Sequence, residues 1–176
     1  MPPKDGRPVI LYRQGKTSGC LYCGLASALA FFGDNAKAKE IFNLQKQYDY
    51  KDSQWDHVIK QMEKCKTNQY VAVRYEDTMP NAVLKEYPHI EDAVLLVVLY
   101  GSDGSTNHSI SICQGFIFDA NLPYALKYSQ KNLDWCCSAP GVNVKFVSFY
   151  KAVYFYPKKV FKHHRIPHLN YHLKME

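Results

Sequence analysis

The feature that most constrains the fold is a continuous apolar run at Ala93–Tyr100, which reads AVLLVVLY. An uncharged run of this length, rich in Val and Leu, is typical of a strand buried on both faces at the centre of a sheet. Alternating residues at Gln69–Tyr75 predict a second strand, and Val142–Phe149 with Ala152–Tyr156 predict a closing antiparallel pair. We therefore expect the second half of the chain to form an antiparallel sheet.

The first half of the chain has helical periodicity instead. Apolar residues recur at helical spacing within Cys20–Gly33, where the final glycine is a natural C-cap. Further helices are predicted at Ala36–Gln47, after an N-cap at Ser53, at Pro80–Tyr87 and after a cap at Ser129. Helices followed by antiparallel strands indicate the α+β class, in a chain long enough to bury a core without disulfides.

Composition and charge indicate the location of the protein and the division of the chain into regions. Six cysteines, no apolar signal segment after Met1 and no apolar run of about 18 residues predict a cytoplasmic, reducing location without a membrane span. The net charge is +6, and residues 158–176 hold five Lys or Arg against one Glu, which gives +4. We therefore divide the chain into a globular domain at residues 1–157 and a basic, His-rich extension at 158–176.

The strongest chemical signal lies around Cys20, in the stretch QGKTSGCLYCGLASALAFFG. A thiol at a helix start sits among unpaired N–H groups at the positive end of the macrodipole, which favours the thiolate. Gln14 precedes Cys20 with five residues between them, and its side-chain amide can join the backbone N–H of Cys20 as an oxyanion donor. The small residues Cys23, Gly24 and Ser27 share the helix face of Cys20 and leave room for another layer.

A second polar group falls on a predicted hairpin, in which His108–Cys113 and Phe116–Asn121 flank a two-residue turn. This register places Asn121 directly opposite His108 and Asp119 on the diagonal. A histidine that acts as a base needs its other ring nitrogen oriented by an amide or a carboxylate. The pairing favours Asn121, whereas a carboxylate stabilises an imidazolium better, so we select Asp119 and keep Asn121 as the alternative.

The residues Gln14-Gly15, Cys20 and Cys23 with the small and apolar helix that follows resemble the catalytic segment of papain-like cysteine peptidases. The helix end at Phe31–Gly33 is similar to the branch of that superfamily that processes bacteriocin leaders, and Phe116–Asp119 resembles the way this branch presents its orienting aspartate. The Trp that follows the cysteine in papain is absent here. We prefer Cys20 to Cys23 as nucleophile because Cys20 keeps the gap from Gln14 without an insertion.

The resemblance implies a papain-like fold, with the nucleophile helix and a helical half packed on a C-terminal antiparallel sheet. It also implies a cysteine peptidase that cleaves peptide or isopeptide bonds without a cofactor. Cys20 would be the nucleophile, His108 the base, Asp119 the orienting residue and Gln14 the oxyanion donor. Transglutaminases, amidases and deubiquitinases use the same machinery, so the resemblance implies a mechanism and leaves the substrate open.

Two other interpretations compete with a thiol enzyme. The basic extension at 158–176, with Phe161 and Tyr171 between its charges, can contact nucleic acid or an acidic partner, as in a catalytically silent binding module. Cys20 and Cys23 have the spacing of half a zinc site, but no second such pair follows, so no metal is expected. His57, in the third predicted helix, is expected to face solvent and to have a structural role.

Overall fold

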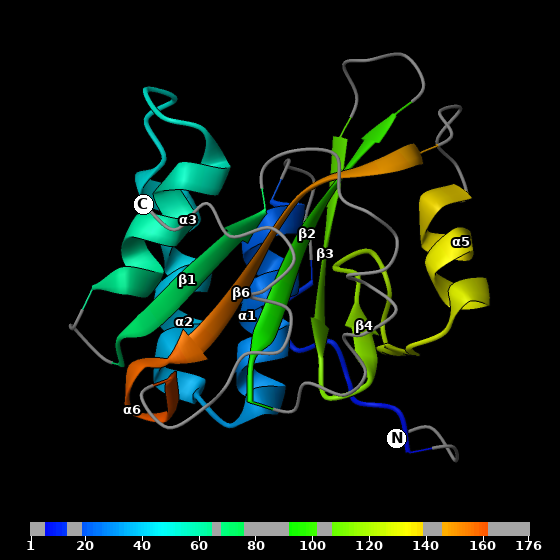
Figure 1. Ribbon diagram of the computed structural model, residues 1–176, viewed down its shortest axis with the longest axis horizontal. Coiled ribbons are helices and arrows are strands. Elements are labelled where there is room, and N and C mark those ends of the chain that lie inside the picture. The colour runs from blue at the N-terminus through cyan, green and yellow to red at the C-terminus, as the bar shows by residue number, and fades with distance from the viewer. Residues whose placement is uncertain are drawn as a thin grey trace.

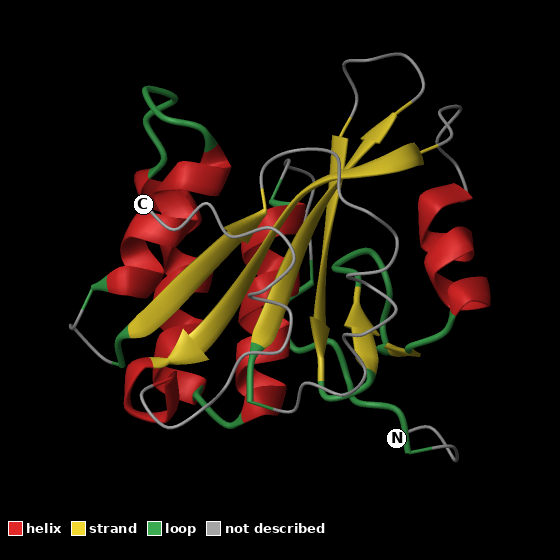
Figure 2. Cartoon of the chain, in the orientation of Figure 1, coloured by secondary structure: helices red, strands yellow, loops and turns green. Residues whose placement is uncertain are grey.

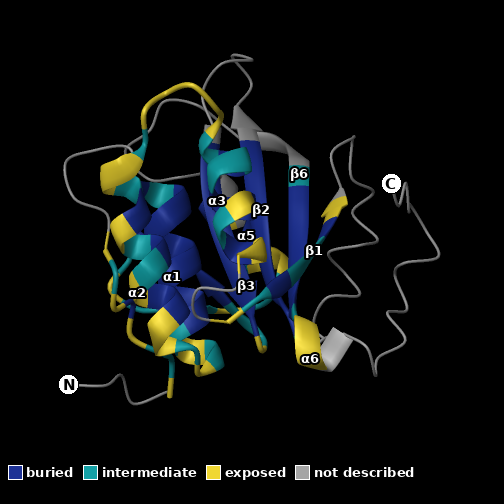
Figure 3. Cartoon of the chain, turned by 90° about the vertical axis from the view of Figure 1, so that its left-hand side faces the viewer, coloured by how far each residue is buried: buried dark blue, intermediate teal, exposed yellow. Residues whose placement is uncertain are grey.

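The computed structural model describes residues 6–13, 19–64, 68–75, 92–101, 107–138 and 146–161 of the 176-residue chain. Its helices α1, α2 and α3 lie together on one face of an antiparallel sheet (Figure 1, Figure 3). The expected α+β class is therefore confirmed. The helix expected at 80–87 and the chain from residue 162 onward lie outside the described residues.

Helices and strands follow one another along the chain much as the sequence pattern indicates (Figure 2). The helices are α1 (Cys20–Phe32), α2 (Asn35–Leu44), the 3₁₀ turn η1 (Gln45–Gln47), α3 (Gln54–Glu63), α5 (Gln130–Ser138) and α6 (Lys158–Phe161). The strands are β1 (Tyr70–Tyr75), β2 (Val94–Gly101), β3 (Asn107–Cys113), β4 (Phe116–Phe118), β5 (Leu126–Lys127) and β6 (Phe146–Pro157).

These six described strands form one sheet in the order β1-β6-β2-β3-β4-β5, and every neighbouring pair is antiparallel. The apolar run identified in the sequence is β2, which pairs with β3 on one side and β6 on the other. Its residues from Val94 to Val97 and Leu99 are fully buried, because their side chains alternate between two cores, one on each face. The prediction of a central buried strand is confirmed.

The strand β6 corrects the expectation of a separate antiparallel pair at 142–149 and 152–156. Residues Phe146–Pro157 form a single strand between β1 and β2, while residues 142–145 lie outside the described part of the chain. No Gly or Pro is present near Tyr150 to turn the chain. Instead, Val98 pairs with Lys151 and Leu99 with Phe149, so Tyr150 has no counterpart in β2 and forms a bulge that keeps the strand continuous.

The helix α1 anchors the core on the helical side of the sheet. Leu21, Leu25 and Leu29 are buried, with at most 4% of their surface exposed, and pack among β2, β3 and the other helices. Each fully buried side chain of this size contributes about 1.5–3 kcal/mol to folding. Gly33 ends the helix in the left-handed region at φ 103°, and its N–H donates to the carbonyl of Ala30, as the predicted cap requires.

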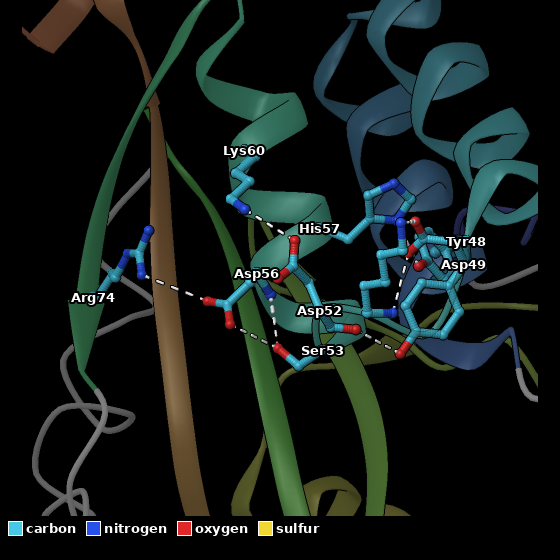
Figure 4. Close-up of polar contacts among 10 residues, drawn as sticks. Tyr48, Asp49, Asp52, Ser53, Asp56, His57, Lys60 and Arg74 are labelled. Carbon is cyan, nitrogen blue, oxygen red and sulfur yellow. Dashed lines mark hydrogen bonds and ion pairs between the residues drawn. The ribbon is translucent and has the colours of Figure 1, made fainter.

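The helix α3 begins at the predicted cap, where the N–H of Asp56 donates to Oγ of Ser53 at 3.1 Å (Figure 4). The expectation that His57 faces solvent is wrong. This histidine is half-buried, and its Nδ1 shares a 3.0 Å hydrogen bond with the hydroxyl of Tyr22 on α1. Its ring also lies 5.7 Å from that of Tyr48, so His57 joins α3 to α1 and to the loop before α3.

Among the described residues, no helix has the length and apolar character needed to cross a membrane.

Candidate active site

Cys20 is the first residue of α1 and lies at the helix end that carries the positive partial charge. Within the described part of the chain, no side chain caps this end, and the first ladder bond runs from the N–H of Cys23 to the carbonyl of Gly19 at 3.0 Å. Cys20 is partly exposed. The helix start therefore presents the Cys20 side chain beside backbone donors that the helix itself does not use.

His108 lies near the start of β3, the strand against which the N-terminal half of α1 packs, and only 7% of its surface is exposed. The imidazole forms a hydrogen bond with the thiol of Cys20, and the backbone N–H of Ser109 also donates to this sulfur. Because Nε2 of His108 faces Asp119, Nδ1 is the ring nitrogen left for the sulfur. Two residues that lie 88 positions apart in the sequence thus meet at one point.

Asp119 completes the line of groups on the far side of the imidazole. Nε2–H of His108 donates to Oδ2 of Asp119 at 2.9 Å, and only 5% of the aspartate surface is exposed. The predicted turn and register are confirmed by the pairs Cys113 with Phe116 and Ser111 with Phe118. The ladder stops there, because β4 ends at Phe118 and Asp119 leaves the strand.

The predicted pairing of His108 with Asn121 is therefore wrong. The chain turns after Asp119, and the backbone N–H of Asn121 donates to Oδ1 of the same aspartate at 3.0 Å. A further backbone bond joins the N–H of Leu122 to the carbonyl of Asp119 at 3.0 Å. Asn121 thus supports the carboxylate through its main chain, and Asp119 is the residue that contacts the ring.

The electrostatics of the three groups favour a thiolate beside an imidazolium. Burial opposes ionisation of Cys20, but the hydrogen bond and charge of His108 outweigh it and hold the pKa of the thiol below its ordinary value. Burial alone would lower the pKa of His108, but the carboxylate of Asp119 and the thiolate of Cys20 raise it to about 10. Each charged group therefore stabilises the ionised form of the next.

Gly24, one helical turn after Cys20, sets how closely α1 approaches the sheet. A Cβ at this position would lie 3.2 Å from the carbonyl oxygen of Phe118 and 3.9 Å from the backbone nitrogen of Ser111. Only glycine lets the helix backbone come this close to β3 and β4 without a shift. The small helix face expected from the sequence does admit another layer, and that layer carries both His108 and Asp119.

The alternative nucleophile Cys23 has a different environment. Only 2% of its surface is exposed, and burial together with the charge of Cys20 raises the pKa of its thiol, although a hydrogen bond with Gln45 opposes this. Gln45 follows α2 and lies against the start of α1, where a Cβ on Gly19 would come 2.6 Å from its Oε1. The contacts with His108 belong to Cys20.

The proposed oxyanion donor Gln14 lies outside the described residues. The segment before it is tied down by backbone bonds from Ile10 to Pro123 and from Ala125 to Pro8, at 2.9 and 2.8 Å. In addition, the N–H of Tyr12 donates to Oγ of Ser27 on α1 at 3.0 Å, and this hydroxyl donates to the carbonyl of Tyr12 at 3.2 Å. The chain is thus fixed to α1 two residues before Gln14.

Comparisons of the chain with protein-family models, with curated proteins and with solved structures give no significant match. Within the ranges that the structure describes, no group of three or more His, Cys, Asp or Glu side chains is placed to hold a metal ion. The site is therefore interpreted from its own residues. Its described members are Cys20, His108 and Asp119, with backbone support from Ser109 and Asn121.

Two contributors to this site have no signal in the sequence. Ser109 acts through its backbone N–H, a group that every residue except proline carries. Gln45 reaches Cys23 and the start of α1 from a 3₁₀ turn more than 20 positions away, and no spacing rule joins these segments. The identity of Ser109 as a serine indicates only that a small side chain is tolerated at this position of β3, and it gives no sign of the role of its backbone N–H.

Proposed function

We propose that the protein is a papain-like thiol hydrolase, most specifically a cysteine peptidase. The observation that carries the proposal is the line of contacts from the thiol of Cys20 through His108 to the carboxylate of Asp119. A thiol at a helix start, a base within hydrogen-bond reach and a third group that orients the base form the arrangement required for nucleophilic catalysis. The helix that carries the thiol packs on the antiparallel sheet that carries the histidine, as the resemblance to papain-like peptidases implies.

The geometry suggests a role for each group. The thiolate of Cys20 attacks the substrate carbonyl carbon, and the developing oxyanion is stabilised by the N–H of Cys20 and by the amide of Gln14. The imidazolium of His108 then donates its Nδ1 proton to the leaving amine, so that the C–N bond breaks and a thioester remains. Water attacks this thioester while His108 accepts its proton, so that the C–S bond breaks, the acid is released and the pair of thiolate and imidazolium is restored. Asp119 holds the ring and stabilises its charge throughout.

Selective alkylation tests this proposal. Iodoacetamide should modify Cys20 faster than it modifies free cysteine at about pH 6, because the ion pair maintains a thiolate below the range of an ordinary thiol. The variant Cys20→Ala should lose turnover of peptide substrates or an active-site probe, whereas Cys23→Ala should retain much of it. Slow alkylation of Cys20, together with no peptide turnover by the unmodified protein, would instead favour a binding module, and full turnover by Cys20→Ala would exclude Cys20 as the nucleophile.

A further inference from the structure

Cys20 and Cys23 are close enough to bond to each other. They occupy the first and fourth positions of α1, and residues three apart in an α-helix have Cα atoms separated by about 5 Å. Disulfides join Cα atoms about 4.4–6.8 Å apart, so this separation needs no large movement of the backbone.

The sulfur of Cys23 lies near the start of α1, where Cys20 is the first helical residue. It is 3.7 Å from the position that a Cβ on Gly19 would take, so the side chain extends back toward the start of the helix. The charge of Cys20 also acts on Cys23, which places the two sulfur atoms in one electrostatic environment. The hydrogen bond with Gln45 further restrains Cys23 at this location.

The two thiols differ in how a reagent from solvent reaches them. Cys20 is partly exposed and its thiolate is favoured by His108, which lowers the pKa of the thiol, whereas only 2% of the surface of Cys23 is exposed. An oxidant therefore meets Cys20 first. Cys23 needs no access to solvent to form a disulfide, because Cys20 is a neighbour within the same helix.

We propose that Cys20 and Cys23 form a peroxide-sensitive dithiol, in which Cys20 is oxidised first and Cys23 resolves the product as an intramolecular disulfide. The thiolate of Cys20 attacks one oxygen of a hydroperoxide, so that an S–O bond forms and the O–O bond breaks, and the leaving oxygen takes a proton from the imidazolium of His108 and departs as an alcohol or water. The sulfur of Cys23 then attacks the sulfur of Cys20, an S–S bond forms and hydroxide leaves with the Cys23 proton as water. Two thiols lose two electrons in total, and the peroxide gains them.

The disulfide blocks the thiol that the proposed peptidase mechanism uses, and a reductant restores it. Formation of the disulfide needs a reactive Cys20 with Cys23 beside it, and it needs no hydrolytic activity. Its effect on hydrolysis rests on the proposed function. A protein without peptidase activity would still form the bond, so the two proposals can fail separately.

The proposal is tested by treating the full-length protein with hydrogen peroxide, digesting it with trypsin and measuring the masses of the peptides. Trypsin cleaves after Lys16 and Lys37, and the peptide Thr17–Lys37 contains Cys20 and Cys23 as its only cysteines. After a brief exposure of the protein to hydrogen peroxide, this peptide should be lighter by two hydrogens and should resist iodoacetamide until dithiothreitol is added. A peptide that keeps both thiols, or that carries added oxygen on Cys20 without a disulfide, would overturn the proposal.

The variant Cys23→Ala provides the matched control. Under the same peroxide exposure its Cys20 should advance to the sulfinic acid, which dithiothreitol does not reduce, so recovery of Cys20 alkylation should fall at least about tenfold relative to the unmodified protein. Cys113→Ala should recover like the unmodified protein, because Cys113 is fully buried on β3. Equal recovery by Cys23→Ala and the unmodified protein would refute a resolving role for Cys23, and the peptide mass of the unmodified protein decides the matter even where a variant folds poorly.

Discussion

Replacing Asp119 with alanine tests the candidate triad most directly. The substitution removes the acceptor that Nε2–H of His108 contacts at 2.9 Å, and both groups are almost completely buried, so water cannot easily take its place. A hydrogen bond to a charged group contributes about 1.5–3 kcal/mol, which corresponds to a loss of about 13- to 160-fold in kcat/KM if the bond is needed in the transition state. The fraction of Cys20 in the thiolate form should also fall, because the imidazolium of His108 stabilises the thiolate.

The matched control is Asn121→Ala. Asn121 supports Asp119 through its backbone N–H, which alanine keeps, so kcat/KM should change by less than about threefold. Asp119→Asn should give an intermediate loss, because an amide can still accept the hydrogen bond but carries no charge. The assay is hydrolysis of a peptide reporter together with the rate of Cys20 alkylation. Equal losses for Asp119→Ala and Asn121→Ala, or a loss confined to Asn121→Ala, would refute the assignment of Asp119.

Three further predictions concern pH, packing and a buried charge. The ion pair exists above the lowered pKa of Cys20 and below the raised pKa of His108, so kcat/KM measured against pH should rise at a lower pH than that at which an ordinary thiol ionises and should fall as the pH rises through about 10. Gly24→Ala should destabilise the protein by about 1–3 kcal/mol in urea unfolding, because its Cβ meets the carbonyl of Phe118. Lys37→Met should cost about 3 kcal/mol in the same assay, since the fully buried ammonium donates to Glu40 and to two carbonyls at the end of α3.

Each of these three has a contrary result. Activity that first appears at the pH where an ordinary thiol ionises would show that no ion pair forms between Cys20 and His108. A gain in stability for Gly24→Ala, as glycine replacement usually gives inside a helix, would mean that α1 does not approach β4 so closely. Unchanged stability for Lys37→Met would show that the buried ammonium makes no net contribution.

Local sequence signals were sufficient for most elements of the fold. Ser53 and Gly33 mark helix ends because their backbone and side-chain chemistry suits a cap, and AVLLVVLY marks β2 because it is a continuous apolar run without a charged residue. The strand β6 could not be predicted as one element. Its continuity past Tyr150 depends on a bulge and on two neighbours that are far away in the sequence, and neither leaves a periodic pattern.

The candidate site also has parts that the sequence predicts and parts that it does not. The spacing of Gln14 from Cys20, and the turn that brings His108 back toward Asp119, are short-range relations that a sequence displays. The choice between Asp119 and Asn121 depended on where β4 ends, since a strand extended to residue 121 would have put the amide opposite the ring. The residue types around Phe118 do not indicate where a three-residue strand ends, because strand preference depends on the neighbours against which the strand packs.

The position of β6 in the sheet has a consequence for synthesis of the chain. In the described structure, β1 pairs only with β6, and β2 has β6 along one full edge, so a ribosome must release residue 157 before the sheet can close. Until then, the nascent chain exposes an unpaired apolar edge at β2, which is a site of aggregation and of chaperone binding. The hairpin that carries His108 and Asp119 is translated earlier and can meet α1 first. A chain stopped between β5 and β6 would therefore keep all three polar groups but lack the strand that holds the sheet together.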